Sequence, residues 1–404
     1  MRTFPHIYID GQWIAPENTA VLEHIDPVTD QPNGQFALAG PADVDRAVAA
    51  ARRAFDTYSQ TTIAERIELL EAIAAEYQRR SEDMVDAMVA DIGAPEAVSR
   101  ELAVPGGIAT FSIAAQQLSS FPFTEQRGRT TVVREPIGVA ALIAPWNYPA
   151  LQLAEKVAPA LAAGCTSVLK IAGLTPFSGI VFTEILHAAG VPQGVVNVIN
   201  GAGTVAGSAM ASHPDVDIVT FTGSTAGGVE VSRAAAPSVK RVGLELGGKS
   251  PHIILEDADV DAAVHTAVES VMRNSGQTCA AATRTLVPRA RQAEIVEKIV
   301  AEVNALTVGA PDGGAQIGPV ASPRQWKDVQ HYIQVGIDEG ATLAAGGTGR
   351  PDGLDTGSYV RPTVFTDVRP DMTIAREEIF GPVMAVIGYD SLEEAVAIAN
   401  DSPY

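Results

Sequence analysis

Residues 137–246 alternate short apolar runs with glycine or proline turns and helix-like segments, and this alternation constrains the fold more than any other feature. The runs TSVLKI and GVVNVIN flank SGIVFTEILHAAG, which has the composition of a helix that ends at Gly190. Nearly continuous apolar strands separated by helices indicate a parallel sheet covered by helices on both faces. A second stretch of similar style begins at residue 248, with helices expected near 259–273 and 291–305. We therefore predict an α/β protein.

The size and charge of the chain exclude several classes of partner. Its 404 residues are enough for two or three domains of ~150 residues. Its net charge is −20, whereas nucleic acids and anionic membranes require fields of Lys and Arg. The N-terminal sequence has no apolar core of a signal peptide, and the most apolar region, 137–165, is interrupted by prolines and charged residues. We expect a cytoplasmic protein with no nucleic-acid or membrane partner.

The chain has only two cysteines, Cys165 and Cys279, which are too few for a disulfide framework or a cysteine-built metal site. The seven histidines show no close ligand spacing, so we expect no bound metal. Cys165 lies at the start of an apolar strand and suits the packing role of most lone cysteines. Cys279 lies among small and polar residues in NSGQTCAAATR, so an inert thiol and an accessible nucleophile both remain open.

Two glycine-rich turns follow apolar runs. In FTGSTAGG, Gly223, Ser224 and Gly228 stand between a strand and a helix, where backbone N–H groups can hold a phosphate. The second turn, GAGTVAG (201–207), resembles a dinucleotide-binding sequence with one extra residue. Tight strand-to-helix turns need glycine even without a ligand, and that explanation is favoured for either turn alone. Two such turns in consecutive units favour a dinucleotide.

Two polar side chains stand in apolar surroundings. Asn147 lies between prolines in APWNYP, where a rigid amide donor suits an oxyanion hole, although a turn hydrogen bond is the favoured explanation for this motif taken alone. Glu245 precedes two glycines in LELGGKSP. A carboxylate there either pairs with a cation such as Lys249, has a raised pKa, or acts as a base.

The order of these motifs resembles that of the NAD(P)-dependent aldehyde dehydrogenase superfamily over essentially the whole chain. The matching motifs are PWNYP, a strand ending at Lys170, FTGSTAGG, LELGGKSP, GQTC and EEIFGPV (377–383). The separation of 34 positions from Glu245 to Cys279 matches as well. Six motifs in the same order make a chance likeness very improbable.

The resemblance implies an aldehyde dehydrogenase-like fold. A Rossmann-like NAD(P)-binding domain would comprise residues 1–117 and 137–247, and residues 118–136 would belong to a small β oligomerisation arm. An α/β catalytic domain would comprise residues 248–404. Family members continue beyond the place where this chain stops, so we expect either a fragment or a shortened relative. A chain complete at that end would form a homodimer or homotetramer.

The resemblance also assigns the chemistry, which is oxidation of an aldehyde to a carboxylic acid with NAD or NADP. Cys279 would be the nucleophile, because an aldehyde releases hydride only after a thiolate has made it tetrahedral. The Asn147 amide and the Cys279 backbone N–H would hold the oxyanion of this thiohemiacetal. Glu245 would activate the water that hydrolyses the resulting thioester.

The resemblance places further residues around the cofactor and the aldehyde. The cofactor residues would be Ile143, Pro145 and Trp146 beside the nicotinamide, Gly223, Ser224 and Gly228 at the pyrophosphate, Lys170 at the adenosine ribose, Gly203 and Gly207 at the adenine, Glu378 and Phe380 at the nicotinamide ribose, and Leu246. The substrate tunnel would be lined by Tyr148, Leu151, Gln152, Glu155 and Thr278. Its polar character favours a neutral or cationic aldehyde of small to medium size.

One departure from the family concerns cofactor choice. Many members have an acidic residue where this chain has Gly173 in KIAG. That acid normally accepts hydrogen bonds from the ribose 2′-OH and repels a 2′-phosphate. We therefore expect a weakened preference for NAD and some tolerance of NADP.

Two other functions remain open. A CoA-acylating relative would transfer the acyl group to a thiol, which Glu245 disfavours because a hydrolytic base is useful only with water. A non-catalytic protein of the same fold would serve as a binding or structural subunit, which the set of Cys279, Glu245 and Asn147 disfavours.

Overall fold

The structure, a computed structural model, describes residues 2–404, and the chain divides into two compact units. The first contains the chain up to Ile25 together with Pro32–Asp91 and Ser99–Leu246. The second contains Asp26–Gln31, Ile92–Val98 and Gly247–Tyr404. The predicted roles of residues 1–117 with 137–247, and of 248–404, as cofactor-binding and catalytic domains stay predictions.

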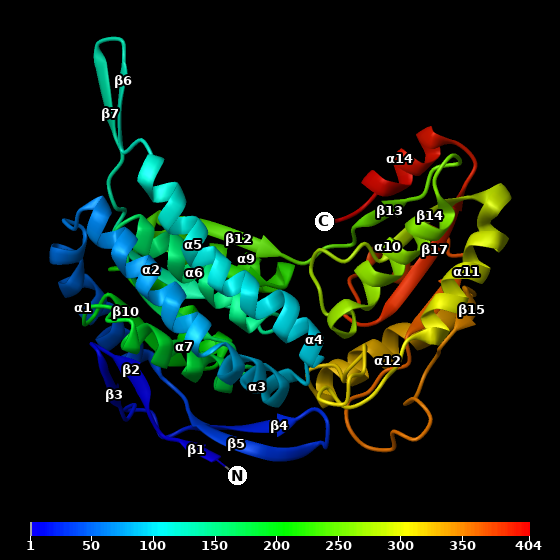
Figure 1. Ribbon diagram of the computed structural model, residues 1–404, viewed down its shortest axis with the longest axis horizontal. Helices are drawn as coiled ribbons and strands as arrows, with labels where there is room; N and C mark the ends of the chain where they lie inside the picture. Colours follow the sequence, from blue (N-terminus) through cyan, green and yellow to red (C-terminus); the bar gives the residue numbers. More distant parts are fainter. Residues whose placement is uncertain (1) are drawn as a thin grey trace. The chain divides into compact units, whose positions relative to one another are not determined.

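A seven-stranded sheet forms the centre of the first unit, in the order β12-β11-β8-β9-β10-β2-β3 (Figure 1). Its strands are β8 (Val139–Ile143), β9 (Thr166–Ile171), β10 (Val196–Asn200), β11 (Ile218–Gly223), β12 (Arg241–Leu246), β2 (Ile7–Ile9) and β3 (Gln12–Ile14). The pairs from β12 to β10 are parallel, while β2 and β3 add an antiparallel edge. The chain moves outward from β8 through β9 to β10 and then returns to β11 on the other side of β8. This is a doubly wound sheet, and the predicted α/β fold is confirmed.

Helices cover both faces of this sheet, as the apolar strands require. The helices α6 (Pro149–Ala162), α7 (Pro176–Ala188), α2 (Ile63–Arg79) and α5 (Val104–Ser120) form one layer, and α1 (Pro41–Tyr58), α8 (Ser208–Ser212) and α9 (Thr225–Ala235) form the other (Figure 1). Alternate side chains of β8, including Ala141 and Ile143, enter the core beneath α1 and α8. The helices α3 (Ser81–Ile92) and α4 (Glu96–Val98) precede a π-helical turn at Ser99–Ala103 that leads into α5.

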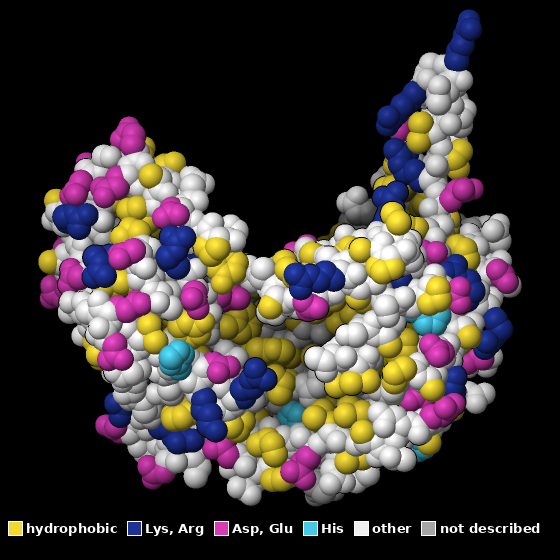
Figure 2. Space-filling model, turned by 180° about the vertical axis from the view of Figure 1, so that it is seen from behind, with side chains coloured by type: hydrophobic (Ala, Val, Ile, Leu, Met, Phe, Trp, Pro, Cys, Tyr) yellow, Lys and Arg dark blue, Asp and Glu magenta, His cyan; other side chains and the backbone are white. Residues whose placement is uncertain are grey.

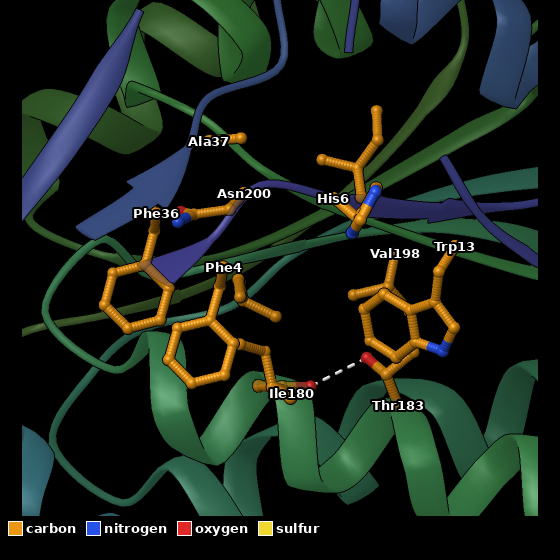
Figure 3. Close-up of a pocket in the computed structure, with 12 residues that line it drawn as sticks. Phe4, His6, Trp13, Phe36, Ala37, Ile180, Thr183, Val198 and Asn200 are labelled. Carbon is orange, nitrogen blue, oxygen red and sulfur yellow. Dashed lines mark hydrogen bonds between the residues drawn. The ribbon is translucent and has the colours of Figure 1, made fainter. Parts of the chain in front are cut away.

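The N-terminal strands β1 (Arg2–Phe4), β4 (Val21–Asp26) and β5 (Gln31–Ala37) form a separate three-stranded sheet. Phe4, Phe36, Val198 and Ile180 line a cavity between these strands, β10 and α7 (Figure 3). It encloses about 20 Å³, room for about one water molecule. This cavity is therefore too small to hold an aldehyde or a dinucleotide.

A β-hairpin of β6 (Thr124–Arg127) and β7 (Thr130–Val133) follows α5 and projects from the first unit (Figure 1). Arg127, Arg129 and Arg134 make it basic in an otherwise acidic protein, as the dark blue side chains along it show (Figure 2). The role of residues 118–136 as part of an oligomerisation arm stays a prediction.

The second unit is built on a five-stranded sheet in the order β13-β14-β17-β16-β15. Its strands are β13 (Pro251–Ile253), β14 (Arg284–Pro288), β17 (Val383–Tyr389), β16 (Thr363–Thr366) and β15 (Thr342–Ala345), of which only β15 is antiparallel to its neighbour. The predicted helices near 259–273 and 291–305 are α10 (Val260–Met272) and α11 (Gln292–Ala305), which share one apolar core with the sheet. The helices α12 (Pro323–Asp338), α13 (Thr373–Arg376) and α14 (Leu392–Asn400) share the core on its other face. Among residues 2–404, no helix is long and apolar enough to cross a membrane.

The start of α7 is held by a buried carboxylate from α3. Asp91 accepts hydrogen bonds from the backbone N–H groups of Phe177 and Ser178, at 2.9 and 2.8 Å, and from the Ser178 hydroxyl at 2.6 Å. The carboxylate thus accepts from N–H groups at the start of the helix that have no acceptor within the helix. Burial nevertheless raises the pKa of Asp91 to about 7, because desolvation outweighs the three hydrogen bonds.

The Asp91→Asn variant should change how stability depends on pH. The pKa of Asp91 is raised from 3.8 to about 7 in the folded protein, so the folded state binds the extra proton between these values. The free energy of unfolding of the native protein should therefore fall as pH rises from about 4 to 7 through this group. Urea denaturation at pH 5 and pH 8 measures the difference. Asp86→Asn, an exposed carboxylate of the same helix, is the control. Equal pH dependence in native protein and Asp91→Asn would contradict the assignment.

The helices α2, α5 and α6 meet at the carbonyl oxygen of Ala150, in the first turn of α6. The Tyr77 hydroxyl donates a 2.9 Å hydrogen bond to this oxygen. A Cβ atom at Gly107 of α5 would lie 2.6 Å from the same oxygen. The close approach of α5 therefore requires glycine at position 107, and it fixes the start of α6.

Gly107→Ala should lower the free energy of unfolding by about 1–3 kcal/mol, because the backbone of α6 must shift to admit the methyl group. This loss should exceed the gain of about 1 kcal/mol that alanine gives in a helix. The control is Gly243→Ala, where the nearest atom would lie 3.9 Å from the new Cβ. Urea titrations of both variants provide the measurement, and the prediction fails if Gly107→Ala is as stable as the native protein.

Candidate active site

The carboxyl ends of β8 and β11 lie side by side where the strand order reverses. In doubly wound sheets this is where ligands bind. After Ile143, which is buried, the chain passes through the half-buried Pro145 and Trp146 to Asn147, which is 4% exposed. Pro149 then opens α6, a position that suits proline because the first helical N–H needs no acceptor. The predicted nicotinamide residues and Asn147 therefore stand at one edge of the sheet.

The turn after β11 begins helix α9. The Ser224 hydroxyl caps this helix by accepting a 3.2 Å hydrogen bond from the Gly227 N–H, and the N–H groups of a first helical turn can bind an anion. Packing explains why position 228 is glycine, because a Cβ atom there would lie 2.8 Å from Leu246 Cδ2. Gly223 likewise lies against the ring of Phe221. Packing alone therefore accounts for two of the predicted phosphate-binding glycines, while Ser224 keeps the geometry of an anion site.

Lys170 and the turn after β10 lie together. The turn predicted from GAGTVAG is a single π-helical turn, Gly203–Gly207, that leads into α8. A Cβ at Gly207 would lie 3.7 Å from Lys170 Cε, whereas the corresponding position at Gly203 is open. The Lys170 ammonium donates a 2.9 Å hydrogen bond to the Ile171 carbonyl, and burial lowers its pKa to about 8. The buried Lys170 ammonium and a neighbouring turn with uncovered glycine backbone together suit the binding of a polar ligand.

A charged cluster that the sequence analysis did not identify lies beneath α6. Lys156 is buried and donates to the hydroxyls of Thr220 and Thr222 on β11, at 3.1 and 2.9 Å. Glu245 is paired with Thr222 in the register of β11 and β12, so both side chains lie on the α6 face of the sheet. Burial lowers the pKa of Lys156 to about 8, although nearby Glu155 and Glu245 favour its charged form.

The residues predicted to line the substrate tunnel differ in exposure. Tyr148 is buried, and Leu151 and Gln152 are half-buried. Leu151 is directed at α5, since a Cβ at Gly106 would lie 3.2 Å from its Cδ1 atom. Glu155 is exposed, yet the protein packed around its carboxyl group raises its pKa, and nearby Glu245 acts in the same direction.

In the second unit, Cys279 is half-buried on the loop that follows α10. Asn274, Ser275 and Gly276 all have left-handed backbone conformations, with φ values of 52°, 56° and 76°. Each non-glycine residue in this region costs about 1–3 kcal/mol, so the surrounding structure must hold the loop. The predicted tunnel residue Thr278, also half-buried, lies on it. Cys165, by contrast, is buried at the start of β9, as expected for packing.

The Glu378 side chain packs against the two glycines that follow β12. The Gly248 N–H donates a 3.2 Å hydrogen bond to Glu378 Oε1, and a Cβ at Gly247 would collide with the same carboxylate. Burial raises the pKa of Glu378, while this N–H and Lys249 oppose the shift. Phe380, two residues on, is half-buried and adopts a left-handed conformation with φ of 56°. The motifs LELGGKSP and EEIFGPV therefore meet in this unit.

The predicted site residues are thus divided between the two units. Asn147, Glu245 and most cofactor residues belong to the first unit, and Cys279, Thr278, Glu378 and Phe380 belong to the second. Within residues 2–404, no group of three His, Cys, Asp or Glu side chains is arranged to hold a metal ion.

Known proteins are similar to this chain in sequence and fold. The sequence pattern described as the aldehyde dehydrogenase family matches residues 13–404. A 3-succinoylsemialdehyde-pyridine dehydrogenase from a Pseudomonas species is 47% identical over 100% of this chain and 85% of its own length. A putative aldehyde dehydrogenase from Staphylococcus saprophyticus is 44% identical, with the same two coverages.

Two solved structures are similarly close. One is an aldehyde dehydrogenase from Pseudomonas syringae, with one cysteine replaced by alanine and with NAD+ and octanal bound. It has a TM-score of 0.97 and 45% identity, over 98% of this chain and 82% of that one. A Mycobacterium tuberculosis aldehyde dehydrogenase complexed with NAD+ has a TM-score of 0.97 and 43% identity, over 100% of this chain and 84% of that one. The chain therefore belongs to the aldehyde dehydrogenase family, as its six ordered motifs predicted.

Proposed function

We propose that this protein oxidises an aldehyde to a carboxylic acid with NAD+ or NADP+, using Cys279 as the nucleophile. The observation that carries the proposal is the family match over residues 13–404, which includes every motif assigned to the chemistry. The half-buried position of Cys279 on a constrained loop supports it, because a nucleophile must be both fixed and accessible.

The first step is attack of the Cys279 thiolate on the carbonyl carbon of the aldehyde. The carbonyl π electrons move to the oxygen, and a thiohemiacetal with an oxyanion forms. We assign the Asn147 amide and the Cys279 backbone N–H as the donors that hold this oxygen. Asn147 suits the role because it is buried and lies between two prolines, so its amide is oriented before the substrate arrives.

The residues at the edge of the first sheet fit a nicotinamide dinucleotide. The capped start of α9 suits a pyrophosphate, and the turn that has open backbone at Gly203 and lies beside Lys170 at Gly207 suits the adenosine half. When bound, the dinucleotide accepts hydride from the substrate carbon. The similar proteins from P. syringae and M. tuberculosis are complexed with NAD+, which supports this cofactor class.

Glu245 is the proposed base that activates water for hydrolysis of the Cys279 thioester. Its place on the α6 face of β12 supports the role, because α6 directly follows Asn147 and a base must lie near the groups that hold the substrate. A hydrolytic base also favours the acid-forming reaction over transfer of the acyl group to CoA.

The substrate is proposed to be a neutral or cationic aldehyde of small to medium size. Glu155 and the polar Gln152 on α6 support this class, since a carboxylate disfavours an anionic substrate. The bound octanal of the P. syringae protein and the name of the Pseudomonas relative point to uncharged aldehydes as the first compounds to test.

Replacing Cys279 and Glu245 should separate the two halves of the reaction. Cys279→Ala should abolish NADH formation from octanal, measured by absorbance at 340 nm. Glu245→Gln should still release about one NADH per subunit in a burst and then turn over roughly 10²–10⁴ times more slowly, because only hydrolysis needs the base. The controls are Cys165→Ala and Glu230→Gln, which replace a buried thiol and an exposed carboxylate outside the site. Full turnover by Cys279→Ala would refute the mechanism.

The same assay distinguishes the two other functions. NADH formation that requires added CoA would identify an acylating enzyme. Absence of NADH with any aldehyde, either cofactor and with or without CoA would identify a non-catalytic protein.

Gly173 should weaken the preference for NAD+. It has an ordinary backbone conformation, and a Cβ there would meet only Leu22 Cδ2 at 3.6 Å, so an acidic side chain can be introduced. The native protein should use NADP+ with kcat/KM within about tenfold of NAD+, and Gly173→Glu should lower kcat/KM for NADP+ alone by roughly tenfold or more through charge repulsion. Gly173→Gln is the uncharged control. A strong NAD+ preference in the native protein would show that Gly173 does not relax selectivity.

A further inference from the structure

The side chain of Gln277 attaches the loop that carries Cys279 to the segment before α12, where the Ser275 hydroxyl also donates a 2.9 Å hydrogen bond to the Gly318 carbonyl. Its Oε1 atom accepts a 2.8 Å hydrogen bond from the Ala321 N–H, and its Nε2 atom donates to the Asn274 carbonyl at 3.1 Å. The Gln277 backbone N–H donates to the same carbonyl, also at 3.1 Å. Both ends of one amide therefore bridge the start of the loop and a separate part of the second unit.

This loop needs such an attachment, because its backbone is otherwise unfavourable. Asn274 and Ser275 occupy consecutive left-handed conformations, although L-residues visit this region only as single residues. Gly276 lies directly against the backbone of Gly381 and Pro382, so a Cβ atom at position 276 would collide with that backbone. The loop is thus held on one side by backbone contact and on the other by the Gln277 amide.

Gln277 is 1% exposed, so its amide does not exchange these partners with water. Both partners are buried as well, and loss of the amide would leave a buried N–H without an acceptor. Cys279 lies only two residues further along the chain. The orientation of the peptide that supplies the Cys279 N–H and thiol therefore depends on where Gln277 is held.

We propose that Gln277 is a positioning residue for the nucleophile: its amide fixes the Cys279 peptide in the orientation that presents both the thiol and the backbone N–H to the substrate carbonyl. The inference rests on the proposed function, in which Cys279 attacks the aldehyde. Gln277 itself exchanges no proton or bond with the substrate.

A second glutamine provides a matched comparison. Gln325, in the first turn of α12, donates a 2.8 Å hydrogen bond to the Phe380 carbonyl. It thus attaches the Glu378–Phe380 segment to the same part of the unit. Replacing Gln325 removes a similar side-chain bond to backbone without touching the bonds of the cysteine loop.

The experiment compares Gln277→Met with Gln325→Met in the full chain. Methionine keeps the length of the side chain and removes the amide. The rate of alkylation of Cys279 by iodoacetamide is measured with Cys165→Ala as the background, and kcat and KM are measured with octanal and NAD+. Gln277→Met should slow alkylation and kcat by roughly 10- to 100-fold, because a misplacement of ~1 Å can cost about 10² in rate. The KM for NAD+ should stay within about threefold.

Gln325→Met should leave alkylation of Cys279 within about twofold of the background and should affect mainly the KM for NAD+. Gln277→Glu keeps an acceptor for the Ala321 N–H and tests the proposal if Gln277→Met does not fold. It should alkylate more slowly than the background protein. The proposal is overturned if folded Gln277→Met and Gln277→Glu alkylate at the background rate, or if Gln325→Met slows alkylation as much as Gln277→Met.

Alkylation requires no aldehyde, so it separates this inference from the proposed function. Native protein that alkylates readily but oxidises no aldehyde would contradict the function and leave the role of Gln277 to be decided by the alkylation rates. Normal oxidation together with unaltered alkylation in Gln277→Met would contradict the inference alone.

Discussion

The reversal of strand order between β8 and β11 is the constraint on which the first unit depends. Parallel strands end at the same edge, so the segments after β8 and β11 must lie next to each other whatever their sequences are. One segment carries Asn147 and the other carries Ser224. The dense packing of α5 on α6 at Gly107 then fixes the helix that follows Asn147. The fold thus provides a rigid amide and a helix start before any ligand is considered.

Buried cations in the first unit are held by hydroxyl or carbonyl oxygens rather than by close carboxylate pairs. Lys156 donates to two threonines and Lys170 to a backbone carbonyl, and burial lowers the pKa of each to about 8. Desolvating an ammonium in this way reduces stability. A tight ion pair would lessen that cost, but it would also neutralise the charge that a polar ligand or a developing anion can use. Burial of these two ammonium groups therefore lowers the stability of the protein at positions where the proposed chemistry needs a positive charge.

The sequence predicted the features that local pattern determines. The parallel sheet, α10 and α11 follow from periodic apolar residues, whereas the roles of Cys279, Glu245 and Asn147 come from the family motifs and stay predictions. The contact of Lys156 with Thr220 and Thr222 was missed because it joins residues more than 60 positions apart. The sequence analysis assigned Gly228 to a phosphate site. Its contact with Leu246 is sufficient to explain why glycine stands at this position, and only the three-dimensional structure reveals that neighbour. The signal available in advance was the alternation of Thr220 and Thr222 on one face of a strand otherwise expected to be apolar.

In the second unit, the segments that carry the proposed site residues are loops rather than strand ends. Their conformation must therefore be held by contacts with other parts of the unit. Loops with left-handed Asn274, Ser275 and Phe380 cannot maintain their shape through local preference alone. They are held by contact with each other at Gly276 and Gly381, and by two glutamine amides that reach backbone groups elsewhere in the unit. A glutamine amide suits this task because it bonds backbone N–H and C=O groups without adding a charge. An uncharged anchor of this kind holds the loop without placing a further charge among buried groups.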